Sequence, residues 1–131
     1  MSEITKKTVD NLTASKFRHA ILAAQRSGNR VLSDLIRPHG LTPAWAEVLT
    51  VLLEHGPLTI QGLSDYLICE ADHPSRLVSR MEAKGLLTRS KNPKDKRAFL
   101  IGLTPEGIEA AKSVLAAENR FDSWITQMLS E

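Results

Sequence analysis

Residues 76–97 of this chain read RLVSRMEAKGLLTRSKNPKDKR, and this stretch decides both the fold and the charge distribution. Eight of its ten charged residues are basic, so it carries +6, whereas the whole chain carries only +2. Its two acidic residues are Glu82 and Asp95. A short segment with this excess of one sign is what a polyanion-binding surface needs. The rest of the chain then serves as the scaffold that holds this surface.

The stretch contains most of a helix and the tip of a hairpin. An apolar stripe that stops at Gly85 predicts a helix from about Asp72. Leu86–Ser90 and Ala98–Leu103 are short strand candidates. The polar, proline-bearing residues 91–97 between them predict a hairpin with a mobile tip.

Two shorter helices precede this segment. Thr42-Pro43 pairs an N-cap with a proline at the first helical position, and Gly56-Pro57 ends that helix. Thr59 caps the next helix, which we expect to run to about Ile68. A helix, a turn, a second helix and a hairpin in this order predict a winged helix-turn-helix over residues 42–103.

Long helices flank this core. Residues 1–11 show no clear period and predict a frayed terminus, followed by a helix over 12–37 that Pro38 and Gly40 end. Thr104-Pro105 starts a last helix that we expect to span 105–131. The fold class is therefore mainly α (α+β), a single domain of residues 1–131 with long helices at both ends.

The first long helix carries a seam suited to packing along another helix. Its apolar or small positions are spaced 4, 3, 4, 3 and 4 residues apart, as in a heptad repeat. They are Phe17, Ile21, Ala24, Gly28, Val31 and Leu35.

Composition indicates a globular protein, with 42% hydrophobic and 24% charged residues in 131. No apolar run approaches the roughly 20 residues that a membrane span needs, and we expect no membrane partner. The start lacks the apolar stretch of a secretory signal, and Cys69 is the only cysteine. A single cysteine allows no intrachain disulfide, so we expect a protein of a reducing cytosol.

The helix that ends at Gly85 has two distinct sides when its residues are placed at 100° steps. One side is apolar and contains Leu77, Val78 and Met81. The opposite side has small residues in its middle and arginines beside them. Its members are Asp72, Ser75, Arg76, Ser79 and Ala83, with His73 and Arg80 at the edge.

Small side chains let a helix axis approach the floor of a DNA major groove. Arg76 can then reach a guanine edge or a phosphate, and Arg80 a phosphate. His73 and Ser75 lie in the first turn, where recognition helices touch bases. The alternative is a solvated helix face with ordinary arginines.

The hairpin tip strengthens the DNA-binding interpretation, because a narrow minor groove attracts an inserted cation. Its basic residues are Lys91, Lys94, Lys96 and Arg97. Asp95 would weaken attraction to DNA, so we expect it to hold Arg97 or Lys96 by an ion pair. The alternative is that Asp95 is an ordinary turn residue.

Three patterns occur in order along the chain: E-x-K-G-L at Glu82–Leu86, D-x-R at Asp95–Arg97 and L-T-x-x-G at Leu103–Gly107. Over about residues 40–110 the sequence resembles the MarR family of bacterial transcription regulators. The resemblance implies a homodimer that binds pseudo-palindromic operator DNA, usually represses transcription, and is released by a small ligand or by oxidation.

By matching position, the resemblance makes Ser75, Arg76 and Arg80 recognition-helix contacts and Arg97 a minor-groove arginine paired with Asp95. Family members usually continue with a further C-terminal helix, whereas this sequence ends at Glu131. We therefore expect the dimer to rely on the seam of the first helix and on the apolar segment 121–129.

Other chemistries receive less support. Cys69 lies beside Glu70 and Asp72, whose charges raise a thiol pKa, so a structural role is favoured over a redox switch. The four histidines lack metal-ligand spacing, and we expect no metal, cofactor or enzyme activity. Arg37, His39 and Trp45 could line a pocket for a small aromatic acid. The alternative is that they take part only in plain helix packing.

The functional prediction is a sequence-specific double-stranded DNA-binding regulator. Within nucleic-acid binding, the rival is an activator or a nucleoid-type binder of low specificity. From another class, the rival is a winged-helix module that binds an acidic protein partner through the same face.

Overall fold

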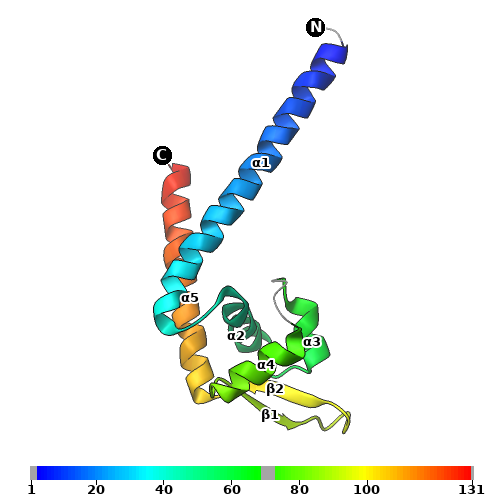
Figure 1. The fold of residues 1–131 in the computed structure, drawn as a ribbon, viewed down its shortest axis with the longest axis vertical. Coiled ribbons are helices and arrows are strands. Elements are labelled where there is room, and N and C mark those ends of the chain that lie inside the picture. The colour runs from blue at the N-terminus through cyan, green and yellow to red at the C-terminus, as the bar shows by residue number, and fades with distance from the viewer. Residues whose placement is uncertain (1–2, 69–72, 131) are drawn as a thin grey trace. The chain divides into compact units, whose positions relative to one another are not determined.

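The computed structural model describes residues 3–68 and 73–130. Helices hold 73% of the residues, and one two-stranded antiparallel sheet completes the fold, which confirms the predicted class (Figure 1). The elements in chain order are α1 (Glu3–Ile36), the 3₁₀ turn η1 (Arg37–His39), α2 (Pro43–His55), α3 (Ile60–Tyr66), α4 (Pro74–Ala83), β1 (Leu87–Lys91), β2 (Phe99–Leu103) and α5 (Pro105–Ser130).

The chain divides into two compact units, Met1–Val31 and Leu32–Glu131. The first unit is the long part of α1, where Phe17 and Ile21 are exposed. The predicted frayed terminus is wrong from Glu3 onward, because α1 begins there. Residues 3–11 contain neither Gly nor Pro, and extending a helix that already exists costs little.

The second unit contains the predicted helix-turn-helix, and its helices begin at the expected caps. The Thr42 hydroxyl accepts the Trp45 N–H at 3.3 Å, and the Thr59 hydroxyl accepts the Gly62 N–H at 3.0 Å. Each bond satisfies one of the free N–H groups at a helix start. The sequence did not predict η1, where the chain makes one further turn before Gly40 takes a left-handed φ of 73°.

The end of α4 explains the E-x-K-G-L pattern. Gly85 has a φ of 78°, which favours glycine, and its N–H donates to the Glu82 carbonyl at 2.9 Å. The Leu86 N–H donates to the Met81 carbonyl at 3.0 Å. These bonds close the helix and turn the chain into β1.

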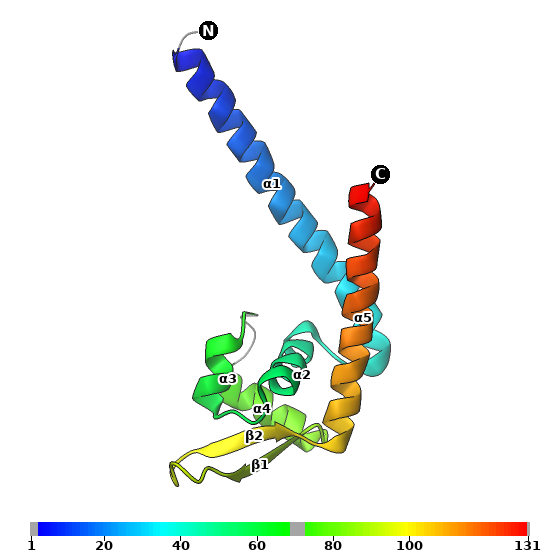
Figure 2. The same ribbon diagram turned by 180° about the vertical axis from the view of Figure 1, so that it is seen from behind.

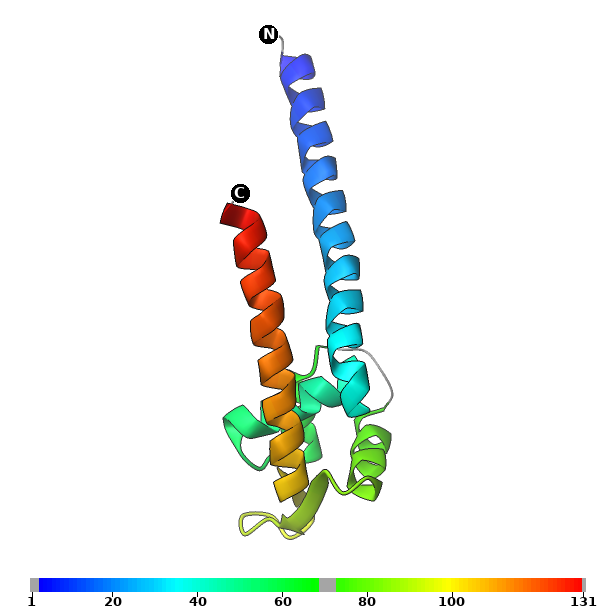
Figure 3. The same cartoon turned by 90° about the vertical axis from the view of Figure 1, so that its left-hand side faces the viewer.

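The hairpin pairs Leu87 with Leu103 at its base and Lys91 with Phe99 at its far end. Leu58 joins the sheet edge, since its carbonyl accepts the Ile101 N–H at 2.6 Å. Figure 2 shows the hairpin extending away from α5, with its tip on the same side as α3. Figure 3 shows α5 starting at the base of the sheet and leading away from it.

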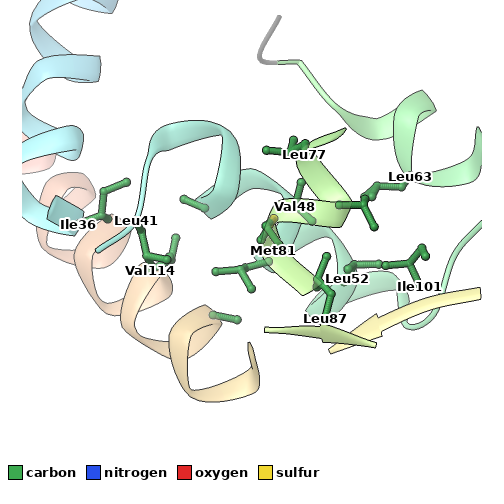
Figure 4. Packing of buried hydrophobic residues seen from close by; sticks show 14 of the residues in the cluster. Ile36, Leu41, Val48, Leu52, Leu63, Leu77, Met81, Leu87, Ile101 and Val114 are labelled. Carbon is green, nitrogen blue, oxygen red and sulfur yellow. The ribbon is translucent and has the colours of Figure 1, made fainter. Parts of the chain in front are cut away.

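The core lies where α2, α4, α5 and the sheet meet (Figure 4). Val48, Met81 and Ile101 are completely buried there. Val114 of α5 packs with Ile36 and Leu41, so the second unit also includes the end of α1. This core fixes the orientation of α4 relative to the hairpin. Among the helices that the structure describes, none has both the length and the apolar character to cross a membrane.

Candidate nucleic-acid interface

Two exposed surfaces of the second unit carry the residues that the sequence singled out. The recognition face is the exposed side of α4 and consists of Ser75, Arg76, Ser79 and Arg80. The wing tip is the turn between the strands and consists of residues 92–97. Lys91, at the end of β1, adjoins the wing tip and is exposed.

The predicted sides of α4 are confirmed. Leu77, Val78 and Met81 are buried in the core. The four residues of the recognition face are exposed and line a shallow surface hollow. On this face the two serines lie next to each other and the two arginines lie beside them, so small side chains border the guanidinium groups.

His73 is the N-cap residue of α4, which begins at Pro74 and not at Asp72. Its carbonyl accepts the N–H groups of Arg76 and Leu77 at 3.0 and 3.1 Å, whereas its side chain makes no capping bond. The exposed imidazole is thus available beside the first turn of the helix. Asp72 and Cys69 lie outside the described residues.

Arg89 forms an ion pair with the helix that precedes its strand. Its Nε lies 2.5 Å from Oε1 of Glu82, and both side chains remain partly exposed. The pair ties β1 to α4 and neutralises both charges. Arg89 therefore serves to hold the hairpin against the helix, a role that the charge count alone did not reveal.

The wing tip is built from two consecutive turns. The Asn92 side-chain oxygen accepts the Lys94 N–H at 3.0 Å, and the Asn92 carbonyl accepts the Asp95 N–H at 3.3 Å. The Asp95 carbonyl accepts the Ala98 N–H at 3.2 Å. Lys94, Lys96 and Arg97 are all exposed on these turns. Sequence reasoning missed Asn92, although an Asn before Pro at a turn start is a known signal.

The predicted ion pair of Asp95 is not present. Its carboxylate accepts the backbone N–H of Arg97 at 3.0 Å, and among the described residues it forms no ion pair. The Asp95 carboxylate lies two residues before the Arg97 N–H, so it closes a local turn with this backbone group more readily than it pairs with the long side chain of Lys96 or Arg97. Asp95 is therefore the turn residue that the alternative interpretation described.

The residues suggested for a ligand pocket lie apart from the basic surfaces. Arg37 and His39 are exposed in η1, and Arg37 pairs with Asp34 at 3.0 Å. Trp45 is half-buried on α2. A hollow with mixed polar and apolar lining lies instead between the start of α3 and the wing tip. It is lined by Thr59, Ile60, Gln61, Arg89, Asn92, Asp95, Arg97, Ala98 and Phe99.

Residues 39–98 match the model of the MarR family. The repressor MdtR of Bacillus subtilis is 32% identical over 98 residues, which are 72% of this chain and 63% of MdtR. The chain thus spans less than two thirds of the length of this curated relative.

Solved structures share the fold. BpsR of Bordetella bronchiseptica, whose DNA binding is regulated by 6-hydroxynicotinic acid, superimposes with a TM-score of 0.71 at 22% identity, covering 80% of this chain and 75% of BpsR. Reduced AbfR bound to DNA gives a TM-score of 0.70 at 20% identity, covering 95% of this chain and 93% of AbfR. The family match over residues 39–98 and the similarity to MdtR support a winged-helix regulator of the MarR type, and the solved structures show the shared fold.

Proposed function

We propose that this protein is a sequence-specific regulator of transcription that binds double-stranded operator DNA and acts as a repressor. The observation that carries the proposal is the recognition face, where small residues lie beside exposed arginines on a helix held beside a basic wing tip. The recognition face enters the major groove, while Lys91, Lys94, Lys96 and Arg97 contact the backbone and the minor groove. Residues 42–103 form the DNA-binding core.

A dimer fits the exposed apolar residues of the terminal helices. On α1 Phe17 is 68% exposed, and on α5 Trp124 and Leu129 are 48% and 82% exposed. Large apolar side chains left in water favour association. We propose that residues 12–37 and 105–131 form the dimer interface, so that two recognition faces read a pseudo-palindromic site.

A small aromatic ligand that releases DNA is proposed by analogy with BpsR and 6-hydroxynicotinic acid. Arg37, His39 and Trp45 are the residues through which an aromatic carboxylate would bind. We propose no catalytic role, and we expect the protein to act in the bacterial cytoplasm, where the operator is.

The test is to sequence genomic fragments that the purified protein retains, with and without aromatic acids, and then to titrate salt. Log K should fall by about 0.9 per neutralised phosphate, and an operator should bind about 10³-fold or more tighter than unrelated DNA. Equal affinity for all fragments would favour a nucleoid-type binder. Preference for an acidic protein at matched salt would favour the protein-interaction alternative.

A further inference from the structure

The wing tip repeats a three-residue unit. Asn92-Pro93-Lys94 is followed directly by Asp95-Lys96-Arg97. Each unit begins with Asn or Asp, whose side chain has an acceptor oxygen bonded to Cγ, and each ends with the cation Lys or Arg. The unit also repeats in hydrogen bonding, because Asn92 accepts the N–H of Lys94 and Asp95 accepts that of Arg97, both at 3.0 Å.

The two turns share one residue. The Asp95 N–H closes the first turn on the Asn92 carbonyl at 3.3 Å, and the Asp95 carbonyl opens the second turn by accepting the Ala98 N–H at 3.2 Å. Lys94 and Arg97 therefore occupy the same position in successive turns. Both side chains are exposed, so the two consecutive turns present Lys94 and then Arg97 along the wing tip.

We propose that Asn92 and Asp95 are positioning residues that pre-order the wing tip for DNA, each acting as a hydrogen-bond acceptor. The carboxylate charge of Asp95 has no part in this role, since its oxygen accepts a backbone N–H and pairs with no described cation. An amide oxygen accepts the same bond. A tip that is ordered before binding loses less conformational entropy on DNA. The DNA part of this inference rests on the proposed function.

The matched pair Asp95→Asn and Asp95→Ala separates the hydrogen bond from the charge, because both variants remove the same charge. Asp95→Asn should bind duplex DNA at least as tightly as wild type, since a negative charge near phosphate is lost. Asp95→Ala should bind about 2- to 10-fold more weakly than Asp95→Asn, as expected for one lost hydrogen bond. Fluorescence anisotropy at fixed salt measures both. Equal weakening in the two variants would show that the charge matters and would overturn the proposal.

A second measurement needs no DNA. The temperature coefficient of the Arg97 amide proton, followed by NMR, should stay that of a bonded amide in Asp95→Asn and become that of a free amide in Asp95→Ala. Asn92→Asp and Asn92→Ala should behave in the same way at Lys94. A bonded Arg97 amide in Asp95→Ala would overturn the turn assignment. If wild type bound no duplex, the proposed function would fail, while the amide signals would still decide whether these side chains order the tip.

Discussion

Replacing Gly107 by alanine should disrupt the junction between the wing and α5. A Cβ at this position would lie 2.1 Å from the Leu86 carbonyl oxygen and 3.1 Å from its carbon. Both atoms belong to the backbone, so neither can swing aside as a side chain does. The same oxygen accepts the Thr104 N–H at 3.1 Å at the start of α5. Relief of the clash therefore requires the backbone at Leu86, which is hydrogen-bonded to Thr104, to move.

The magnitude follows from these contacts. Overpacking against a fixed neighbour costs about 1–3 kcal/mol, and weakening the Leu86–Thr104 hydrogen bond adds about 0.5–1.5 kcal/mol. The higher helix propensity of alanine returns about 0.8–1 kcal/mol. We expect Gly107→Ala to lower the free energy of unfolding by about 0.5–3.5 kcal/mol, the net of these terms.

Urea unfolding followed by helical circular dichroism, at one protein concentration, measures this change. Gly62→Ala is the matched control, because its Cβ would meet only side-chain atoms, the nearest being the Thr59 hydroxyl oxygen at 3.3 Å. The control should change stability by less than about 1 kcal/mol. The reasoning is refuted if Gly107→Ala is as stable as Gly62→Ala.

Three further substitutions test separate features. Arg76→Ala should reduce discrimination between operator and mutated sites by about 1–3 kcal/mol in competition binding, and an equal loss on all sequences would contradict base contact. Lys94→Ala should weaken all duplexes alike and flatten the salt slope by about one, whereas an unchanged slope would exclude a phosphate contact. Burial, and then repulsion from Asp122, raise the pKa of Glu118, so its ionisation destabilises the fold as pH rises above 4.5. Glu118→Gln should raise the melting temperature at pH 7 but not at pH 4, and an equal rise at both values would contradict this assignment.

Much of the helix-turn-helix and the hairpin could be predicted because their signals are local. Thr42 and Thr59 cap the helices that they were expected to start, and Gly85 ends α4. The apolar stripe of α4 indicated which side is buried, so its exposed side was also correct. Both strands begin one residue later than predicted, and Lys91 belongs to β1.

Other features depend on contacts or local geometry that charge counting does not reveal. The pair of Glu82 with Arg89 joins two elements seven residues apart, and it removes one arginine from the basic surface. The role of Asp95 was predicted from charge, but a nearby backbone N–H competes better for its carboxylate. Residues 3–11, the N-terminal part of α1, have no clear apolar period, so the sequence did not predict that they are helical.

Hydroxyl-radical footprinting on a retained genomic fragment in dilute buffer tests the central claim most directly. The recognition face and wing tip of two protomers should protect two tracts whose centres lie about 34–36 Å apart or a multiple of this. A variant carrying both Arg76→Ala and Arg97→Ala should lose that protection. Absence of protected nucleotides on every genomic fragment would contradict the account.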